Sequence, residues 1–287
     1  MRVLVVGGTG TVGRELAARL RERDVETRVL TRSPEKHRGN GIEFVAGDLE
    51  KPETLAPAFA GVDRVYLITP LHPKEAEIGQ AAVRASVEGG AERIVLQTVH
   101  QAEAAPHVPH FASKLEMVQA VRESGIPWVD LAPNSFFQND LRYRAALLDH
   151  GVYPQPIGKR GASRVDVRDI ADLAVALLLG DGHEGRTLPV VGADPLTGEW
   201  TAEVWSDRLG RPVRYIGDDL EAWSTQARGM LPDWLVGDLA MMYRHFQEKG
   251  LVATEAELNQ VRDLLGREPR SFDDFAGETA ARWKSEG

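Results

Sequence analysis

Apolar residues in the first part of the chain alternate between short continuous runs and runs in which they recur every three or four positions. The segment "RVLVV" (2–6) is continuously apolar and ends in glycines, as is typical of a strand buried on both faces of a sheet. The next segment, 12–24, carries Val12, Leu16 and Leu20 at helical spacing. This pattern predicts a buried strand followed by an amphipathic helix.

The alternation of strands and helices continues as far as residue 132. Further strands are predicted at 26–32, 41–48, 63–69, 92–98 and 126–132. Helices are predicted between them at 51–60, 74–90 and 113–125. Such alternation predicts an α/β fold in which a doubly wound parallel sheet of the Rossmann type carries helices on both faces.

The pattern changes after about residue 150. Helices are predicted at 166–179, 201–210 and 231–250, without regular strands between them. The first of these reads as a helix that packs back on the sheet. The chain is therefore predicted to form a Rossmann domain over 1–150, with 160–192 packing back on it, and a smaller, mostly helical part over 193–287.

Composition and charge exclude several classes of protein. The absence of cysteine removes disulfides, thiolate catalysis and thiolate metal sites. A formal net charge of −9 argues against nucleic-acid partners, and no apolar stretch reaches the roughly eighteen residues of a membrane span. His100, His107 and His110 lie near one another, but their spacing matches no common zinc-ligand pattern, so no metal site is predicted. These features predict a cytoplasmic protein without membrane or nucleic-acid partners.

The stretch "VVGGTGTVGREL" (5–16) carries three glycines at a regular spacing, directly after the first strand and at the start of the first helix. Gly7 allows a sharp turn, Gly10 allows the backbone to approach a pyrophosphate, and Gly13 allows the helix to pack close to the sheet. The N-terminus of the helix then presents unpaired N–H groups to the phosphates. The stretch predicts a dinucleotide site; a purely structural turn is the alternative.

Two further strand ends carry candidate cofactor contacts. The second strand ends in "VLTRSPEK", which has Arg32 and Lys36 where a carboxylate would favour NAD, so a 2′-phosphate and hence NADP is preferred. An ordinary exposed arginine is the alternative interpretation of Arg32. Asp48 follows the third strand, where it can accept a hydrogen bond from an adenine amino group while Leu49 packs on the ring. Asp48 can equally cap the next helix.

With these residues in place, the chain resembles the NmrA-like family of atypical short-chain dehydrogenases/reductases. The matching stretches run from residue 3 to about 180 and include "VVGGTGTVGREL", "LTRSPEK", "AGDLEKPETL", "VYLITP", "SKLEMVQAVRESGIPWVDLAPNSFFQN" and "DVRDIADLAVALL"; "LGRPVRY" (209–215) extends the likeness. The resemblance implies a Rossmann domain with a smaller C-terminal substrate-binding part and NAD(P) bound between them. The family contains quinone and other oxidoreductases as well as redox-sensing regulators.

The resemblance also implies roles for individual positions. The residues that would hold the pyrophosphate are Gly7, Thr9, Gly10, Thr11, Val12 and Gly13. Arg32 would hold the 2′-phosphate with Lys36 close by, and Asp48 and Leu49 would hold the adenine. The residues along the central ribose and under the nicotinamide would be Thr69 and Pro70, and Pro133, Asn134, Ser135 and Phe136. Thr98 would lie near the substrate. Ala132 stands where the family often has arginine, which weakens the case for an anionic substrate.

The stretch "HFASK" (110–114) occupies the position of the Tyr-x-x-x-Lys pair of short-chain dehydrogenases. Lys114 matches the lysine, which implies that it binds the cofactor ribose. His110 stands in the place of the tyrosine, either as a proton donor or as a space-filling residue at the mouth of the cleft. Pro106 and Pro109 predict a loop just before it, so the one-turn spacing of the pair on a helix is not secure.

These residues predict an NADP(H)-dependent oxidoreductase that transfers hydride to a small conjugated carbonyl or quinone, as a monomer or homodimer. The alternative is an NAD(P)-binding redox sensor without turnover. A sugar epimerase or isomerase is disfavoured, because those enzymes rely on the missing tyrosine.

Overall fold

The computed structural model describes residues 1–37 and 41–286 as two compact units. The first unit comprises Met1–Pro133 and Val167–Pro189, and the second comprises Asn134–Asp166 and Val190–Gly287. The first unit thus lacks residues 134–150, which the sequence pattern had placed with the sheet. The chain leaves the sheet at Pro133 and enters a 3-10 turn, Phe137–Tyr143, of the second unit.

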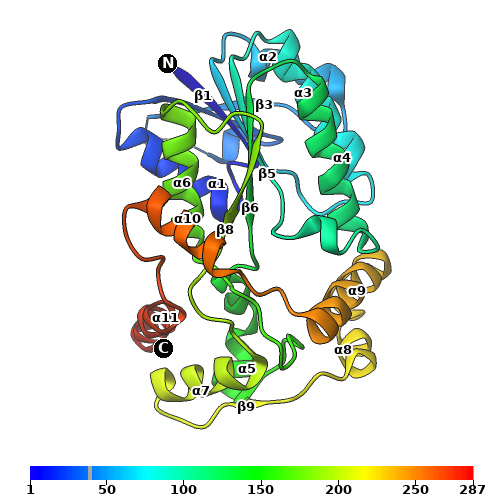
Figure 1. Cartoon of the computed structure of the whole chain (residues 1–287), viewed down its shortest axis with the longest axis vertical. Coiled ribbons are helices and arrows are strands. Elements are labelled where there is room, and N and C mark those ends of the chain that lie inside the picture. The colour runs from blue at the N-terminus through cyan, green and yellow to red at the C-terminus, as the bar shows by residue number, and fades with distance from the viewer. Residues whose placement is uncertain (38–40, 287) are drawn as a thin grey trace. The chain divides into compact units, whose positions relative to one another are not determined.

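A seven-stranded sheet forms the centre of the first unit (Figure 1). Its strands are β1 (Arg2–Val6), β2 (Glu26–Thr31), β3 (Ile42–Ala46), β4 (Arg64–Leu67), β5 (Arg93–Gln97), β6 (Trp128–Pro133) and β8 (Arg186–Val190). The order is β3-β2-β1-β4-β5-β6-β8, and the pairings from β3 through β6 are parallel. The chain winds outward from β1 in both directions, so the predicted Rossmann-type sheet is confirmed. The edge strand β8 was not predicted.

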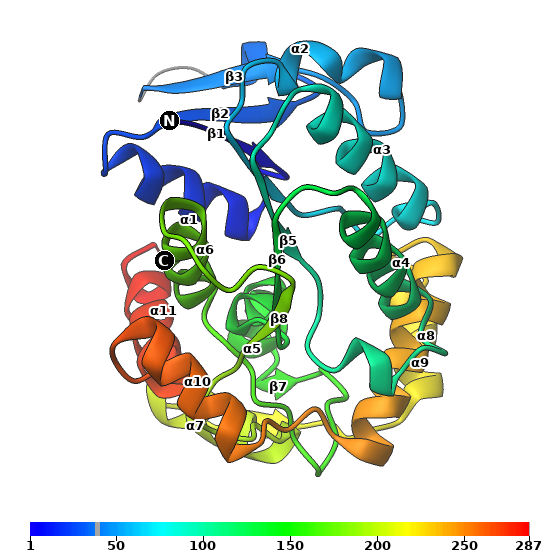
Figure 2. The same ribbon diagram turned by 45° about the horizontal axis from the view of Figure 1, so that its top comes forward.

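Helices cover both faces of this sheet (Figure 2). Helices α1 (Thr11–Arg21) and α6 (Val167–Leu179) pack together on one face, and Arg19 Nε donates to Asp172 Oδ1 at 2.7 Å between them. Helices α2 (Ala56–Phe59), α3 (Glu75–Glu88) and α4 (Pro109–Glu123) lie on the other face. A continuous buried cluster between the sheet and α3 and α4 includes side chains from all these layers: Leu4, Val6, Leu67, Ala82, Val83, Ile94, Leu96, Met117 and Val121.

The helix predicted at 51–60 is broken into two short pieces. A 3-10 turn, Pro52–Thr54, precedes the single-turn helix α2. Pro57 is the second residue of α2 and has no N–H to donate to the preceding turn, so a helix continuous from residue 51 would lose a hydrogen bond there.

The second unit combines a small sheet with several helices. Strands β7 (Val152–Tyr153) and β9 (Arg214–Tyr215) pair in parallel. Its helices are α5 (Arg144–Asp149), α7 (Gly198–Leu209), α8 (Leu220–Ala227), α9 (Asp233–Lys249), α10 (Glu255–Leu265) and α11 (Phe272–Glu286). Aromatic side chains from several of these elements form its core; Trp205 and Trp283, for example, stack at 5.3 Å between ring centroids. Helices α5, α8, α10 and α11 and strands β7 and β9 were not predicted.

Candidate functional site

A cleft of about 630 Å³ opens at the carboxyl ends of the central strands of the first unit. It is lined by the loops that follow β1, β2, β3 and β4 and by the start of α3: Gly7, Thr9, Gly10, Leu30, Thr31, Arg32, Ser33, His37, Gly47, Asp48, Leu49, Glu50, Ile68, Thr69, Pro70, His72 and Ile78. The strand order reverses between β1 and β4, and open α/β sheets bind ligands outside the strand ends at such a reversal.

The glycine loop forms a cradle whose open side faces the cleft. Gly7 has φ of +80°, and its carbonyl accepts a hydrogen bond from Gly10 N at 3.0 Å. A Cβ on Gly13 would collide with the backbone of Gly7 and Gly8, whereas a Cβ on Gly10 would meet only Gly7 O, at 3.3 Å. Gly10 is the N-cap of α1 and supplies no capping side chain. The first N–H groups of α1 therefore fit a bound pyrophosphate.

The other residues assigned to the pyrophosphate have different positions. Thr9 lines the cleft, while Thr11 is the exposed first residue of α1. Val12 is only 2% exposed and packs in the core, so its side chain is not available to a ligand. Thr11 and Val12 lie in the first turn of the helix, so their backbone N–H groups can contribute to the binding site at the helix N-terminus.

The residues predicted to bind the adenosine follow β2 and β3. Arg32 is exposed and lines the cleft together with Ser33. Lys36, which was also assigned to the cofactor, ends a 3-10 turn and is not among the lining residues. His37 lines the cleft instead and stacks on Phe44 at 4.8 Å. Sequence reasoning missed His37, although its position directly after "RSPEK" is a local signal.

Asp48 and Leu49 both lie in the cleft wall. The Oδ1 atom of Asp48 accepts a hydrogen bond from Glu50 N at 3.1 Å, which fixes the turn after β3. Glu50 Oε1 in turn lies 3.3 Å from His72 Nε2, and both residues line the cleft. This contact joins the loops after β3 and β4 in the cleft wall.

Lys114 is buried beside the cleft wall. Its Nζ donates to Thr69 Oγ1 at 2.8 Å and lies 2.6 Å from Glu75 Oε1. Thr69 lines the cleft and also donates to Glu75 Oε1, at 2.6 Å. The ammonium thus contacts the hydroxyl of Thr69, a residue predicted to lie along the ribose. Pro70, the neighbour of Thr69, lines the cleft as well.

His110 and Lys114 lie one turn apart on a single helix. Helix α4 begins at Pro109, four residues before the predicted start, so residues 109–112 are helical, and the predicted loop is confined to the turn at 106–108. Proline fits the first helical position because that position needs no N–H. His110 is half-buried and meets the ring of Phe111 edge-on at 4.7 Å.

Thr98 belongs to a second buried polar cluster of the first unit. Its hydroxyl donates to Asp130 Oδ1 at 2.7 Å, and Thr187 also bonds to Asp130. Burial raises the pKa of Asp130 to about 6, although these hydrogen bonds and the charge of Lys114 act in the opposite direction. Asp130 was not singled out from the sequence, yet a carboxylate inside the apolar run "WVDLA" is a signal, since acids are rarely buried without a partner.

The raised pKa of Asp130 makes the free energy of unfolding depend on pH. The folded pKa of about 6 lies above the ordinary carboxyl value of 3.8, so the folded state holds the proton more tightly. Stability from this group is therefore full at acid pH and is lost as the pH rises between those two values. Between those two pH values, the free energy of unfolding of Asp130→Asn should rise relative to that of the wild type by about 3 kcal/mol, as measured by urea unfolding. The exposed Asp149→Asn is the control, and a pH-independent difference for Asp130→Asn would contradict the assignment.

The last predicted cofactor residues fall where the chain passes from the first unit into the second. Pro133 is the final residue of β6, whereas Asn134, Ser135 and Phe136 belong to the second unit. Asn134 is 1% exposed; its Nδ2 donates to Leu251 O at 2.7 Å and its Oδ1 accepts from Ser135 N at 2.8 Å. Asn134 therefore joins the first segment of the second unit to the chain after α9 in the same unit.

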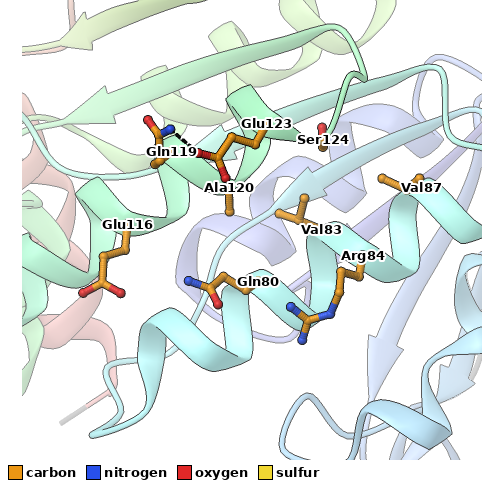
Figure 3. A pocket seen from close by; sticks show the side chains of 9 residues that line it. All are labelled: Gln80, Val83, Arg84, Val87, Glu116, Gln119, Ala120, Glu123 and Ser124. Carbon is orange, nitrogen blue, oxygen red and sulfur yellow. Dashed lines mark hydrogen bonds between the residues drawn. The ribbon is translucent and has the colours of Figure 1, made fainter.

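A second hollow of about 440 Å³ lies between α3 and α4 (Figure 3). Its side chains are mostly polar or charged, and Gln119 donates to Glu123 within it. The hollow is lined by Gln80, Val83, Arg84, Val87, Glu116, Gln119, Ala120, Glu123 and Ser124. None of the described residues that line this hollow lines the cleft at the strand ends, so the two are separate.

The fold and the glycine cradle are those of the Rossmann class of dinucleotide-binding proteins. Residues 1–276 match the model of the NmrA-like family. The chain belongs to this family, and the resemblance seen in the sequence is confirmed.

Known relatives extend over the whole chain. It is 36% identical over 285 residues to an NAD(P)H azoreductase of Xenophilus azovorans, covering 97% of this chain and 98% of the relative. It is 35% identical over 293 residues to a (4-alkanoyl-5-oxo-2,5-dihydrofuran-3-yl)methyl phosphate reductase of Streptomyces griseus, covering 99% and 100%. Among solved structures, an NADPH-dependent quinone oxidoreductase of Escherichia coli in complex with NADPH has a TM-score of 0.85 at 21% identity, covering 96% and 99%. This last likeness concerns the fold.

The described residues, 1–37 and 41–286, include no helix long and apolar enough to cross a membrane.

Proposed function

We propose that the protein is an NADP(H)-dependent oxidoreductase that transfers hydride to a small conjugated carbonyl or quinone-type acceptor. Support comes first from the cleft, whose lining includes the glycine cradle at the strand-order reversal and Arg32, with Lys114 bonded to the lining residue Thr69. Two relatives of at least 35% identity over nearly the whole chain are named as reductases, one of them for NAD(P)H. The oxidoreductase predicted from the sequence agrees with these names.

Different residues in and beside the cleft bind different parts of the cofactor. The N–H groups at the start of α1 bind the pyrophosphate, and the guanidinium of Arg32 binds the 2′-phosphate. The ammonium of Lys114 donates to a hydroxyl of the nicotinamide ribose. The reduced cofactor supplies the hydride.

The acceptor follows from the missing tyrosine. His110 stands where related dehydrogenases carry the acid that protonates a carbonyl oxygen. A conjugated acceptor needs no such acid, because its negative charge spreads over several atoms after hydride transfer and water can supply the proton. The Streptomyces griseus relative is named for a substrate that carries conjugated carbonyl groups, which favours the same class here.

A panel of acceptors tests this reaction. The purified protein is mixed with NADPH and, separately, a soluble quinone, an azo dye, an unsaturated lactone and a saturated ketone, and NADPH consumption is followed. We expect turnover with one or more conjugated acceptors and none with the saturated ketone. Tight NADPH binding without consumption by any acceptor would instead favour a redox sensor.

Arg32 should decide the choice between the two dinucleotides. Arg32→Ala should weaken NADPH binding by about tenfold or more while NADH binding changes by less than about twofold, because only NADPH carries the 2′-phosphate. Fluorescence titration with both cofactors measures the two affinities. Lys36→Ala is the comparison, since Lys36 lies outside the cleft lining. An equal loss of NADPH and NADH binding in Arg32→Ala would refute the assignment.

A further inference from the structure

Glu75 forms a buried ion pair with Lys114. No role for Glu75 follows from the sequence or from the proposed cofactor contacts. It is the first residue of α3 and is 1% exposed. Its Oε1 receives both the ammonium of Lys114 and the hydroxyl of Thr69, each at 2.6 Å. Lys114 also donates to Thr69, so the three side chains form a closed triangle.

The packing of α3 against α4 brings these residues within reach. A Cβ on Gly79 would lie 2.7 Å from Met117 Cγ and Sδ, so a side chain at this position would force Met117 to move. Met117 lies one turn after Lys114 on α4, and its Sδ is 3.6 Å from Thr69 Oγ1. The N-terminus of α3 also favours a carboxylate at Glu75, through the helix dipole.

The hydrogen bonds of the triangle leave capacity for a ligand. An ammonium has three N–H groups, and the described residues provide Lys114 with two acceptors, Thr69 and Glu75. Glu75 Oε2 is buried without a partner among the residues that the structure describes. Buried polar atoms in native proteins are nearly always paired, so the triangle is incomplete without a further group.

From these contacts we infer that Glu75 is a positioning residue for the cofactor. It holds the Lys114 ammonium against Thr69, so that the remaining N–H serves a hydroxyl of the nicotinamide ribose. A lysine side chain has four flexible methylenes and keeps a buried position only when a counter-ion compensates its charge. This inference rests on the proposed function, because it assigns Lys114 to the nicotinamide half of NADPH.

Two probes separate positioning from a general role in the fold. NADPH carries the nicotinamide ribose, whereas adenosine 2′,5′-bisphosphate carries only the adenosine half. Both are titrated against the wild type, Glu75→Gln, Lys114→Met and the double variant. Glu77→Gln is the matched control, because Glu77 lies in the same helical turn and is exposed.

We expect Glu75→Gln to weaken NADPH binding by about tenfold and to leave adenosine 2′,5′-bisphosphate within about twofold of the wild type. The double variant should bind NADPH no more weakly than Lys114→Met, because Glu75 acts through Lys114. Glu77→Gln should bind both probes as the wild type does. If Glu75→Gln does not fold, Glu75→Asp should show the same selective loss at about threefold or more.

Unchanged NADPH binding in Glu75→Gln or Glu75→Asp would overturn the inference. Equal losses of affinity for both probes would also overturn it, because they would show that Glu75 acts only on the fold. Additive losses in the double variant would mean that Glu75 acts independently of Lys114. Since every readout is a binding affinity, a wild type that binds NADPH without oxidising it would refute the reductase and leave the assignment of Glu75 standing.

Discussion

Gly10→Val should weaken NADPH binding by about a hundredfold or more while the protein stays folded. The N–H groups of the first turn of α1 bind phosphate only if the backbone can approach it, and a branched side chain at Gly10 would fill that space. Two lost hydrogen bonds to a charged group, at about 1.5–3 kcal/mol each, account for the loss. The fold should survive the change, since the φ of −80° at Gly10 is ordinary and a Cβ would meet only Gly7 O, at 3.3 Å, which a shift of a few tenths of an ångström relieves. Fluorescence titration and thermal unfolding measure the two effects.

Gly13→Ala serves as the comparison, because this change should lower the free energy of unfolding. Its Cβ would overlap the backbone of Gly7 and Gly8, so the loop or the helix must shift. We expect a loss of about 3 kcal/mol in the free energy of unfolding. If Gly10→Val bound NADPH as the wild type does, the phosphate site would not lie at this loop.

Arg164→Met should destabilise the second unit by about 3–5 kcal/mol. Arg164 and Asp140 are both fully buried, with Arg164 Nη2 2.6 Å from Asp140 Oδ1. Tyr153 and Trp205 also donate to the same carboxylate, at 3.1 and 3.0 Å. Removing the guanidinium leaves that carboxylate buried without its counter-ion. Urea unfolding monitored by circular dichroism measures the loss.

An exposed pair in the same unit provides the control for Arg164→Met. Arg208 binds Asp273 at the surface, with side chains 43% and 45% exposed, so Arg208→Met should cost less than about 1 kcal/mol. Replacing both buried charges, in Asp140→Asn with Arg164→Met, should recover part of the stability that the single change loses. Similar losses for Arg164→Met and Arg208→Met would show that burial does not decide the effect.

The sheet and the glycine loop could be predicted because their signals are local. Parallel strands buried on both faces appear as continuous apolar runs, as in "RVLVV", and the glycines at 7, 10 and 13 follow the first of them directly. Helices α10 and α11 and strand β8 were missed. Helix α10 has a capping box, Thr254 with Glu257, that the sequence shows and that could have located its start.

The contacts of the site depend on residues far apart in the chain. Lys114 was predicted from its motif, but Thr69 lies 45 positions before it, and Glu75 appears in the sequence as one of several acids at the start of a helix. Only the packing of α3 against α4 brings them together. The predicted start of α4 is four residues late for a simpler reason: a proline such as Pro109 indicates a loop but also fits the first position of a helix, which it occupies here.

Hydride transfer within a single turnover tests the proposed reductase most directly. The NADPH-bound protein is mixed anaerobically with a soluble quinone, and the near-ultraviolet absorbance of NADPH is followed. We predict that this absorbance falls by the amount of bound cofactor, with an equal amount of hydroquinone formed, and that Gly10→Val shows neither change. NADPH that stays bound and unoxidised, with the quinone and with each of the other conjugated acceptors, would contradict the proposal.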